Sequence, residues 1–328
     1  MFLGVDHGTT AIRFATPEGR CWELPRREAA SLDPEEIIRR VQENLGLFAV
    51  DLVALTYSMG DGLTRIVRLE DAPNRGLIRQ DGAGLHLGGG TRVFEAITCS
   101  GWPAVLLPGI HKASGIDPRL KVFSHGMSPE KVGLAYSLFR KGVSSFIVSD
   151  ASSNTVTFAV LRGRIIGAID APIFAPGLAQ GPLDVDAIRS IDSGRLTANE
   201  AFTRGGILAK MGRSSLEECT SGEKRMALEA LALFAAMEIG ALLVLMRDLG
   251  EPKPRIFLAG SPAPLIEHRV AGLLGTDVGT LGRCAAAEGC ARIAEDVFRG
   301  MKSILGLEVD ERAMSRGRDG GWPDERRG

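Results

Sequence analysis

The segment GVDHGTT, residues 4–10, brings an acid, a histidine, two glycines and two threonines together directly after an apolar start. If it joins the end of one strand to the next, its backbone N–H groups and two hydroxyls surround one concavity, with Asp6 at the rim. Phosphate oxygens need such donors, and the carboxylate would act through a hydrated Mg²⁺ ion. Gly8, Thr9 and Thr10 are therefore candidate phosphate ligands, while a plain hairpin with a satisfied Asp turn explains the isolated segment equally well.

A second segment, DASSNT at 150–155, again sets an acid at the end of an apolar run before small polar residues. The two turns could face each other across a cleft and hold a nucleotide's phosphates. Asp6 and Asp150 would then position Mg²⁺ and a nucleophile, with lobe closure excluding water. The further phosphate ligands expected here are Ser152, Asn154 and Thr155.

A third segment, LAGSP at 258–262, ends a short apolar run in Gly260 and Ser261. A glycine at a strand end lets the backbone approach a ligand closely, which would suit an adenosine. The three segments therefore follow one order along the chain, from strand-end Asp to strand-end Asp to strand-end Gly, and together they predict ATP as the ligand.

The elements that must position these residues form a repeated pattern. Residues 2–25 alternate strand, turn, strand, turn and strand, and residues 145–173 repeat that order before leading into helical territory. Two such meanders half a chain apart predict a duplicated α/β architecture. We expect lobes at 1–142 and 143–290, a helix at 291–308 packing back on the first lobe, and a charged, Gly-rich disordered tail at 309–328.

Composition limits the partners. The chain has 328 residues and a formal net charge of −1, so no global field favours nucleic acid or an anionic membrane. Its five cysteines are scattered without CxxC spacing, which argues against a disulfide framework or a zinc site and indicates a reducing cytoplasm. The apolar stretch 230–246 is shorter than the roughly 20 residues of a membrane span and contains Glu238, which predicts a buried core helix.

The order of the three segments resembles the superfamily of acetate kinases, sugar kinases, Hsp70 and actin, whose phosphate-1, phosphate-2 and adenosine motifs span most of the chain. The resemblance implies a two-lobed actin-like ATPase fold, related to ribonuclease H, with ATP and Mg²⁺ between the lobes. Within this superfamily, one segment resembles acetate and butyrate kinases. Residues 123–136, FSHGMSPEKVGLAY, are similar to their Phe-His-Gly-Thr-Ser-His segment, and the resemblance aligns His125 with their catalytic histidine. APGLAQGPLDVD at 175–186 and MEIGA at 237–241 resemble further segments of that branch.

The sequence lacks the two substrate arginines that acetate kinases carry. Thr56 to Asp61 and Gln180 to Leu183 stand where acetate kinases carry their two substrate arginines, and the glycine-rich phosphate-2 loop is replaced by 151–154. A carboxylate kinase needs fixed cations for its substrate and the transferring phosphoryl group, so these departures argue against acetate kinase activity. The other cations considered as replacements, or as ordinary solvated charges, are Lys112, Arg119 and Lys121.

The strings MFLGVDHGTTAIRFA, HLGGGTRVF, PGIHKASGIDPR and SHGMSPEKVG are similar over residues 1–305 to the methanogenesis marker protein 12 family. That resemblance implies an archaeal, cytoplasmic protein of methanogens. The glycines in HLGGGT, residues 86–91, either open a helix N-terminus that takes an anion or form a plain turn. Four of the five histidines, at positions 7, 86, 111 and 125, lie near these motifs without metal-ligand spacing.

Three functions remain open on these grounds. The first is an ATP-dependent phosphotransferase acting on an unknown small molecule bound beside His125. The second is an ATPase-type assembly or regulatory factor for a methanogenic enzyme, and the third is a nucleotide-binding module that has lost catalysis. The expected partners are a nucleotide, an acceptor, a methanogenic protein and a second copy of the chain, with no nucleic acid and no membrane.

Overall fold

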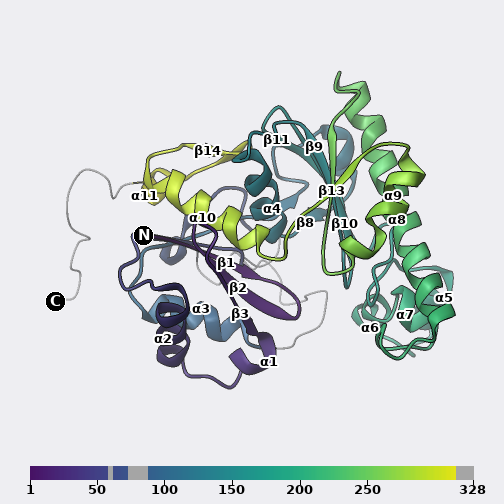
Figure 1. The fold of residues 1–328 in the computed structure, drawn as a ribbon, viewed down its shortest axis with the longest axis horizontal. Helices are drawn as coiled ribbons and strands as arrows, with labels where there is room; N and C mark the ends of the chain where they lie inside the picture. The colour runs from purple at the N-terminus through teal and green to yellow at the C-terminus, as the bar shows by residue number, and fades with distance from the viewer. Residues whose placement is uncertain (58–61, 73–87, 315–328) are drawn as a thin grey trace.

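Two β-sheets stand on either side of a central pair of helices (Figure 1). The computed structural model describes residues 1–57, 62–72 and 88–314. The first sheet has the order β3-β2-β1-β4-β6-β5, in which β1, β4 and β6 are parallel. Its strands are β1 (Phe2–His7), β2 (Ala11–Ala15), β3 (Cys21–Pro25), β4 (Leu52–Leu55), β5 (Val67–Arg68) and β6 (Ala104–Leu106).

The second sheet has the order β11-β10-β9-β12-β13. The antiparallel meander β9–β10–β11 is followed by β12 parallel to β9 and by β13 parallel to β12. Its strands are β9 (Phe146–Ala151), β10 (Thr155–Leu161), β11 (Arg164–Ile169), β12 (Arg255–Ala259) and β13 (Val278–Thr280). Both predicted meanders are confirmed, because the turns at 8–10, 16–20, 152–154 and 162–163 separate the apolar runs as expected.

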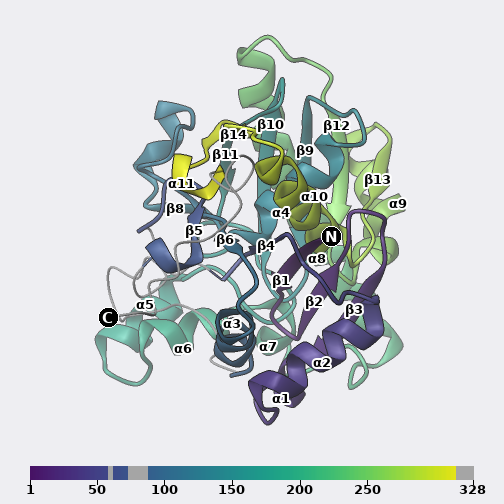
Figure 2. The same ribbon diagram turned by 90° about the vertical axis from the view of Figure 1, so that its left-hand side faces the viewer.

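The helices α4 (Glu130–Phe139) and α10 (Ala285–Phe298) lie between the sheets, and α10 also packs on β1 and β4 (Figures 1 and 2). Glycines permit these contacts. A Cβ on Gly4 would lie 2.0 Å from the Ala287 carbonyl oxygen, and one on Gly289 would lie 1.9 Å from that of Gly133. A helix does pack back on the first lobe, but it begins at Ala285 rather than at 291 and ends at Phe298.

The remaining helices cover the outer faces of the two sheets. The first lobe carries α1 (Arg26–Ala29), α2 (Pro34–Leu45) and α3 (Gly90–Cys99), and the second carries α8 (Ser221–Asp248) and α9 (Ala263–Leu274). Three short helices, α5 (Val185–Asp192), α6 (Ala198–Thr203) and α7 (Ile207–Lys210), gather beside the beginning of α8 (Figure 1). A capping box starts α8, in which Glu223 accepts from the Thr220 N–H and the Thr220 hydroxyl accepts from the Glu223 N–H.

Helix α8 contains the apolar stretch 230–246 and packs against β9, β10 and α9. This helix is long and apolar enough to cross a membrane by length and composition alone. Its most apolar 18-residue window has a mean hydropathy of 2.1, and 39% of that window is buried. Its contacts with the second sheet agree with the predicted core helix. The residues buried in this interface include Ala227, Leu231, Ala235, Ile239 and Leu242.

After α10 the chain forms the hairpin β14 (Ser303–Ile304) and β15 (Leu307–Glu308), and then the short helix α11 (Glu311–Met314). Val309 bridges to Ile66, and the Asp310 N–H donates to the Ile66 carbonyl. The prediction of a disordered tail from 309 is therefore wrong for residues 309–314, because they pair with the first lobe. Residues 315–328 lie outside the described part of the chain.

Candidate functional site

The two predicted acids lie near the carboxyl ends of β1 and β9, which each pair with a parallel strand of their own sheet. Asp6 is the fifth residue of β1, and Asp150 is the fifth residue of β9. Both are buried, at 3% and 9% exposure. Burial is the main cause that raises the pKa of Asp6, and the charge on Asp150 makes the smallest contribution in the same direction, so the two acids lie within electrostatic reach of each other.

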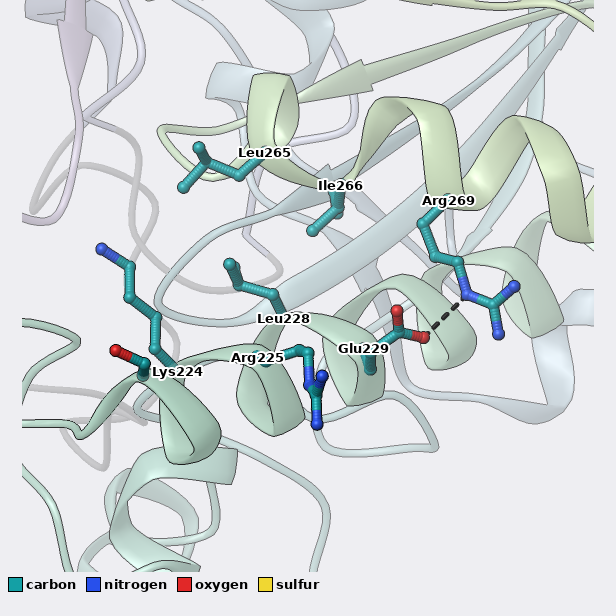
Figure 3. A pocket seen from close by; sticks show the side chains of 8 residues that line it. Lys224, Arg225, Leu228, Glu229, Leu265, Ile266 and Arg269 are labelled. Atoms are coloured by element: carbon teal, nitrogen blue, oxygen red, sulfur yellow. Dashed lines mark hydrogen bonds and ion pairs between the residues drawn. The ribbon is translucent and has the colours of Figure 1, made fainter.

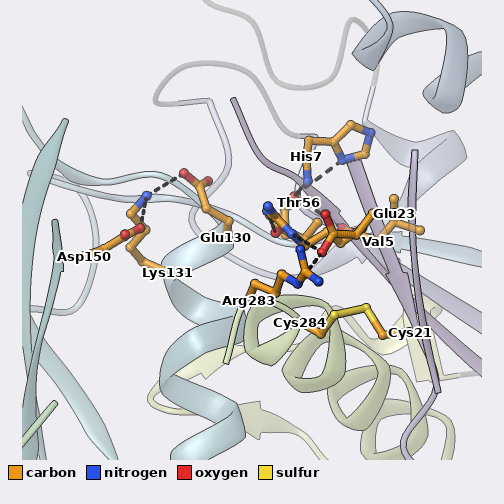
Figure 4. Close-up of polar contacts among 12 residues, drawn as sticks. Val5, His7, Cys21, Glu23, Thr56, Glu130, Lys131, Asp150, Arg283 and Cys284 are labelled. Carbon is orange, nitrogen blue, oxygen red and sulfur yellow. Dashed lines mark hydrogen bonds and ion pairs between the residues drawn. A yellow bond between two sulfur atoms is a disulfide. The ribbon is translucent and has the colours of Figure 1, made fainter. Parts of the chain in front are cut away.

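Lys131, in the first turn of α4, lies between Glu130 and Asp150 (Figure 4). Its ammonium lies 2.8 Å from Glu130 Oε1 and 3.0 Å from Asp150 Oδ2. Burial opposes a charge on Lys131, but the two carboxylates outweigh it and raise its pKa above the ordinary value. The cation of this site is therefore a lysine that sequence reasoning did not single out, although it lies in the SPEK string at the start of a helix.

Asp6 is the least satisfied acid of the site. Its Oδ1 is buried without a hydrogen-bond partner, and its Oδ2 lies 3.5 Å from Arg13 Nη1. Burial and the nearby Glu130 carboxylate raise the pKa of Asp6 to about 7, against the opposing charges of Arg13 and Lys131. A carboxylate oxygen with an unused lone pair suits a cation or a metal-bound water.

Mg²⁺ fits this donor set as a hydrated ion. Within the described residues, no group of three or more His, Cys, Asp or Glu side chains is arranged to hold a metal. Mg²⁺ usually keeps several waters and uses one or two protein carboxylates together with substrate phosphates. Asp6 and Asp150 can supply those carboxylates, with Lys131 already compensating one of them.

The turn after β1 is exposed, as a phosphate-facing loop requires. Thr9 and Thr10 are exposed and Gly8 is partly buried. A Cβ on Gly8 would lie 2.8 Å from both the Ala11 carbonyl oxygen and Arg13 Nη1, so glycine lets this guanidinium reach the turn. Arg13 is a second cation that sequence reasoning missed.

The turn after β9 is partly covered by the segment 175–180. The Leu178 N–H donates to the Ser152 carbonyl, and the Ala179 and Gln180 N–H groups donate to Ser153. A Cβ on Gly177 would lie 2.3 Å from Asn154 Cα, so this segment packs directly on the turn. Ser152 and Asn154 remain partly exposed.

Thr155 does not serve as predicted. Its side chain is fully buried, and its hydroxyl donates to the Pro176 carbonyl at 3.1 Å. Because it begins β10 with its side chain against the covering segment, Thr155 anchors that segment instead of facing the cleft.

Gly260 follows β12 with φ +97°, and a Cβ there would lie 2.5 Å from the Ala151 carbonyl oxygen. This glycine therefore brings the predicted adenosine segment against the turn that follows Asp150. Ser261 is exposed beside it. The two predicted segments are adjacent, and the close approach that glycine permits is to the protein's own backbone.

A cavity of about 390 Å³ lies between α8 and α9, a few residues beyond Gly260 (Figure 3). Leu228, Leu265 and Ile266 form its apolar wall. Its polar lining consists of Ser221, Lys224, Arg225, Glu229 and Arg269, with Arg269 bonded to Glu229 at 2.7 Å. Its volume falls within the range of small-molecule sites.

His125 lies in β8 (His125–Met127), which pairs with β7 (Ile110–His111) and contacts β11. Its Nδ1 is 3.1 Å from Asp170 Oδ2, and its side chain is 33% exposed. Asp170 directly follows β11, a strand-end acid that sequence reasoning did not select.

The other candidate side chains lie elsewhere. His111 is buried and its Nε2 contacts the Leu63 carbonyl. Arg119 pairs with Asp117 and Asp248 at the surface, and Lys112 and Lys121 are exposed, so the solvated alternative holds for these three cations. Of HLGGGT, His86 lies outside the described residues.

The glycines of that segment are packed. A Cβ on Gly89 would lie 2.2 Å from the Arg26 carbonyl oxygen, and one on Gly90 would lie 2.8 Å from the Tyr57 ring. These contacts favour a plain turn leading into α3 over an anion site.

One disulfide contradicts the interpretation of the cysteines. Cys21 in β3 is bonded to Cys284, the residue before α10 (Figure 4). Their separation of 263 residues in the sequence concealed the pair, because nothing in the cysteine spacing indicates which strand and helix meet.

Comparison with known proteins identifies the family. No protein-family model matches the chain. Over 322 residues it is 47% identical to a UPF0285 protein of Methanosarcina barkeri, covering 94% of this chain and 99% of that protein. The chain belongs to the UPF0285 family. A UPF0285 protein of Methanocaldococcus jannaschii is 38% identical over 326 residues, covering 94% of this chain and 98% of its own length.

Solved structures confirm the predicted fold of this UPF0285 protein. A propionate kinase from Francisella tularensis aligns with TM-score 0.58 and 13% identity, covering 90% of this chain and 98% of that one. An acetate kinase from Porphyromonas gingivalis aligns with TM-score 0.51 and 12% identity, covering 87% and 89%. The protein has the two-lobed actin-like ATPase fold.

Proposed function

We propose that this UPF0285 protein binds ATP with Mg²⁺ and transfers the terminal phosphoryl group to a small-molecule acceptor. The observation that carries the proposal is the convergence of Asp6, Asp150 and Lys131 at one site, with a buried, unpartnered oxygen on Asp6. Mg²⁺ would neutralise the developing charge on the phosphates. The kinase-like fold of the solved relatives supports the same reading.

The cavity between α8 and α9 supports a place for the adenosine. It adjoins the segment that begins at Gly260, so a nucleotide seated there would run its phosphates toward the turns at 8–10 and 152–154. Lys224, Arg225 and Arg269 line the cavity together with one acid, Glu229, so its lining carries a net positive charge that suits an anionic ligand.

A second candidate is an ATPase-type factor that assembles or regulates a methanogenic enzyme. The observation that favours it is that the turn at 152–154, where phosphate ligands were predicted, is partly covered. N–H groups of the segment 175–180 already donate to the Ser152 and Ser153 carbonyls of that turn. Named relatives occur in methanogens, which supports a role in methanogenesis and the resemblance to marker protein 12. Phosphate release from ATP without an acceptor, together with co-purification of a methanogenic enzyme, would favour this candidate.

Calorimetry with ATP and ADP, with and without Mg²⁺, tests the site. We expect saturable, Mg²⁺-dependent ATP binding that weakens at least about tenfold in Asp6→Ala, because the carboxylate that meets the metal is lost. The matched control is Asp51→Ala, which removes an exposed acid beside the beginning of β1 and β4 and leaves affinity unchanged. Absence of binding at millimolar nucleotide, or unchanged binding in Asp6→Ala, would contradict the proposal.

A further inference from the structure

A disulfide and an ion pair join the edge of the first sheet to the segment that returns from the second lobe (Figure 4). The disulfide connects Cys21 of β3 to Cys284, which lies between β13 and α10. Two residues further along β3, Oε1 of Glu23 lies 3.1 Å from Arg283 Nε. The Arg283 side chain is 78% exposed, and an exposed ion pair contributes little by itself. The neighbouring disulfide is therefore the stronger restraint on the position of Arg283.

The strand register continues this contact toward the candidate site. Glu23 in β3 is the partner of Arg13 in β2, and Arg13 is the partner of Asp6 in β1. Side chains at paired positions lie on the same face of a sheet, so the three form one row across three strands. Arg13 lies between the two acids, 3.5 Å from Asp6 Oδ2 and 3.6 Å from Glu23 Oε1. Its Nε is buried without a hydrogen-bond partner, so neither acid holds the guanidinium tightly.

The position of Arg283 sets how strongly Glu23 attracts Arg13. Both guanidinium groups approach the same oxygen, Oε1 of Glu23. While Arg283 is held there, its charge offsets that of Glu23 and leaves Arg13 near Asp6 and Gly8. Once Arg283 is released, the charge of Glu23 is no longer shared and draws Arg13 away from the site.

We propose that the Cys21–Cys284 disulfide is a redox switch for nucleotide binding. Arg283 and Glu23 are the positioning residues that transmit its state to Arg13. This inference rests on the proposed binding of ATP with Mg²⁺. In the oxidised protein Arg13 supplies positive charge to the phosphates of the nucleotide. In the reduced protein Arg13 turns toward Glu23, and MgATP binds more weakly.

The disulfide is placed for exchange with a dithiol, because both of its cysteines are partly exposed. A thiolate of the dithiol bonds to Cys21 Sγ, the bond between the two cysteines breaks, and its electron pair leaves with Cys284. Cys284 is the better leaving group because it is the N-cap of α10, whose first N–H groups stabilise a thiolate. The second thiol of the dithiol then displaces Cys21. The balance is one protein disulfide and one dithiol giving two protein thiols and one cyclic disulfide.

Calorimetry on the full chain compares MgATP affinity before and after reduction with dithiothreitol, and a thiol assay reports the state of the disulfide. We expect reduction to weaken MgATP binding at least about fivefold. Cys21→Ser should bind MgATP like reduced wild type and should not respond to dithiothreitol. The matched control is Cys99→Ser, which removes an exposed free thiol and should keep the full response.

Two further variants test the path through the ion pairs. Arg283→Gln should weaken MgATP binding as much as reduction does, although its disulfide is intact. Glu23→Gln should bind MgATP equally in its oxidised and reduced forms, because the acid that draws Arg13 away is gone. The matched control is Arg299→Gln at the other end of α10, which removes an exposed pair with Glu295 and should keep the affinities of wild type in both states. Circular dichroism and thermal melts show whether each form is folded at the temperature of the titration.

Equal MgATP affinities of oxidised and reduced wild type would overturn this inference and leave the proposed function standing. A disulfide that dithiothreitol does not open in the folded protein would have the same consequence. A redox response that persists in Glu23→Gln would overturn the transmission through Glu23 and Arg13. Absence of MgATP binding in both redox states would overturn the proposed function and this inference together.

Discussion

At the scale of single residues, Lys131 is a buried cation of the site. It is 4% exposed, and its ammonium pairs with the carboxylates of Glu130 and Asp150. Replacing it by methionine keeps the volume but leaves Glu130 and Asp150 without their cation. We expect Lys131→Met to lower the free energy of unfolding by about 3–5 kcal/mol at pH 7, measured by urea denaturation. Lys131→Arg, which retains the charge, should lose much less, and equal losses in both variants would show that shape and not charge matters.

Glu238 gives a pH prediction, because it is fully buried in α8 and burial raises its pKa to about 8. The Thr157 hydroxyl and the Ala175 N–H donate to its two carboxylate oxygens and lower its pKa, but burial outweighs them. A folded-state pKa above the unfolded value of 4.5 stabilises the protein at low pH, and this contribution is lost as pH rises toward 8.

The expected slope from this one group is about 1.4 kcal/mol per pH unit between pH 5 and 7. Glu238→Gln resembles the protonated acid and should remove that slope, so that the variant exceeds wild type in stability at pH 8 and approaches it at pH 5. Urea denaturation across this range measures the effect. Parallel pH profiles for the two proteins would refute the assignment.

The residues of the site were predictable where one strand and its following turn suffice. Asp6, Asp150 and Gly260 follow directly from apolar runs that end in turns. Lys131 and Asp170 could not be predicted in this way. Their partners, Asp150 and His125, lie on other elements that only the folded sheet brings near. The prediction of Thr155 as a phosphate ligand was wrong. The direction of a side chain at the first residue of a strand depends on strand pairing, which the sequence does not show.

At the scale of elements, glycines set how closely α4, α10 and β1 pack. A Cβ on Gly289 of α10 would lie 1.9 Å from the Gly133 carbonyl oxygen in α4. We expect Gly289→Ala to destabilise the protein by about 1–3 kcal/mol, since the helices must separate to admit a methyl group. The effect is measured by chemical denaturation.

A matched control exists in α9, where a Cβ on Gly272 would have no atom within 4 Å. Gly272→Ala should be neutral or stabilise by up to about 1 kcal/mol through helix propensity. Loss of stability in both variants would mean that backbone freedom, and not the α4–α10 contact, explains the first result.

Element boundaries were less predictable than element types. The meanders follow from alternating apolar residues and turn residues, whereas α10 ends at Phe298, earlier than the predicted 308. Ala285 to Ala287 are buried because the start of this helix approaches β1 and α4 closely. The hairpin at 303–308 was missed because each of its strands has only two residues.

At the scale of the whole molecule, the chain passes from the first lobe to the second before β9 and returns between β13 and α10. Cys284 lies in the returning segment, and its disulfide to Cys21 ties that segment to β3. Beside it, Arg283 pairs with Glu23 at 3.1 Å, Glu23 lies 3.6 Å from Arg13, and Arg13 reaches Asp6. A series of ion pairs therefore joins this crossing to the candidate site.

The disulfide closes nearly the whole chain into one loop, so its main effect should be to restrict the unfolded state. We expect Cys21→Ser to lower the free energy of unfolding by about 2–4 kcal/mol, and a reducing agent to lower wild type to the same value. Cys99→Ser, which removes an exposed free thiol, should unfold like wild type. Equal stability of oxidised and reduced wild type would show that the fold's own contacts already fix the returning segment against β3.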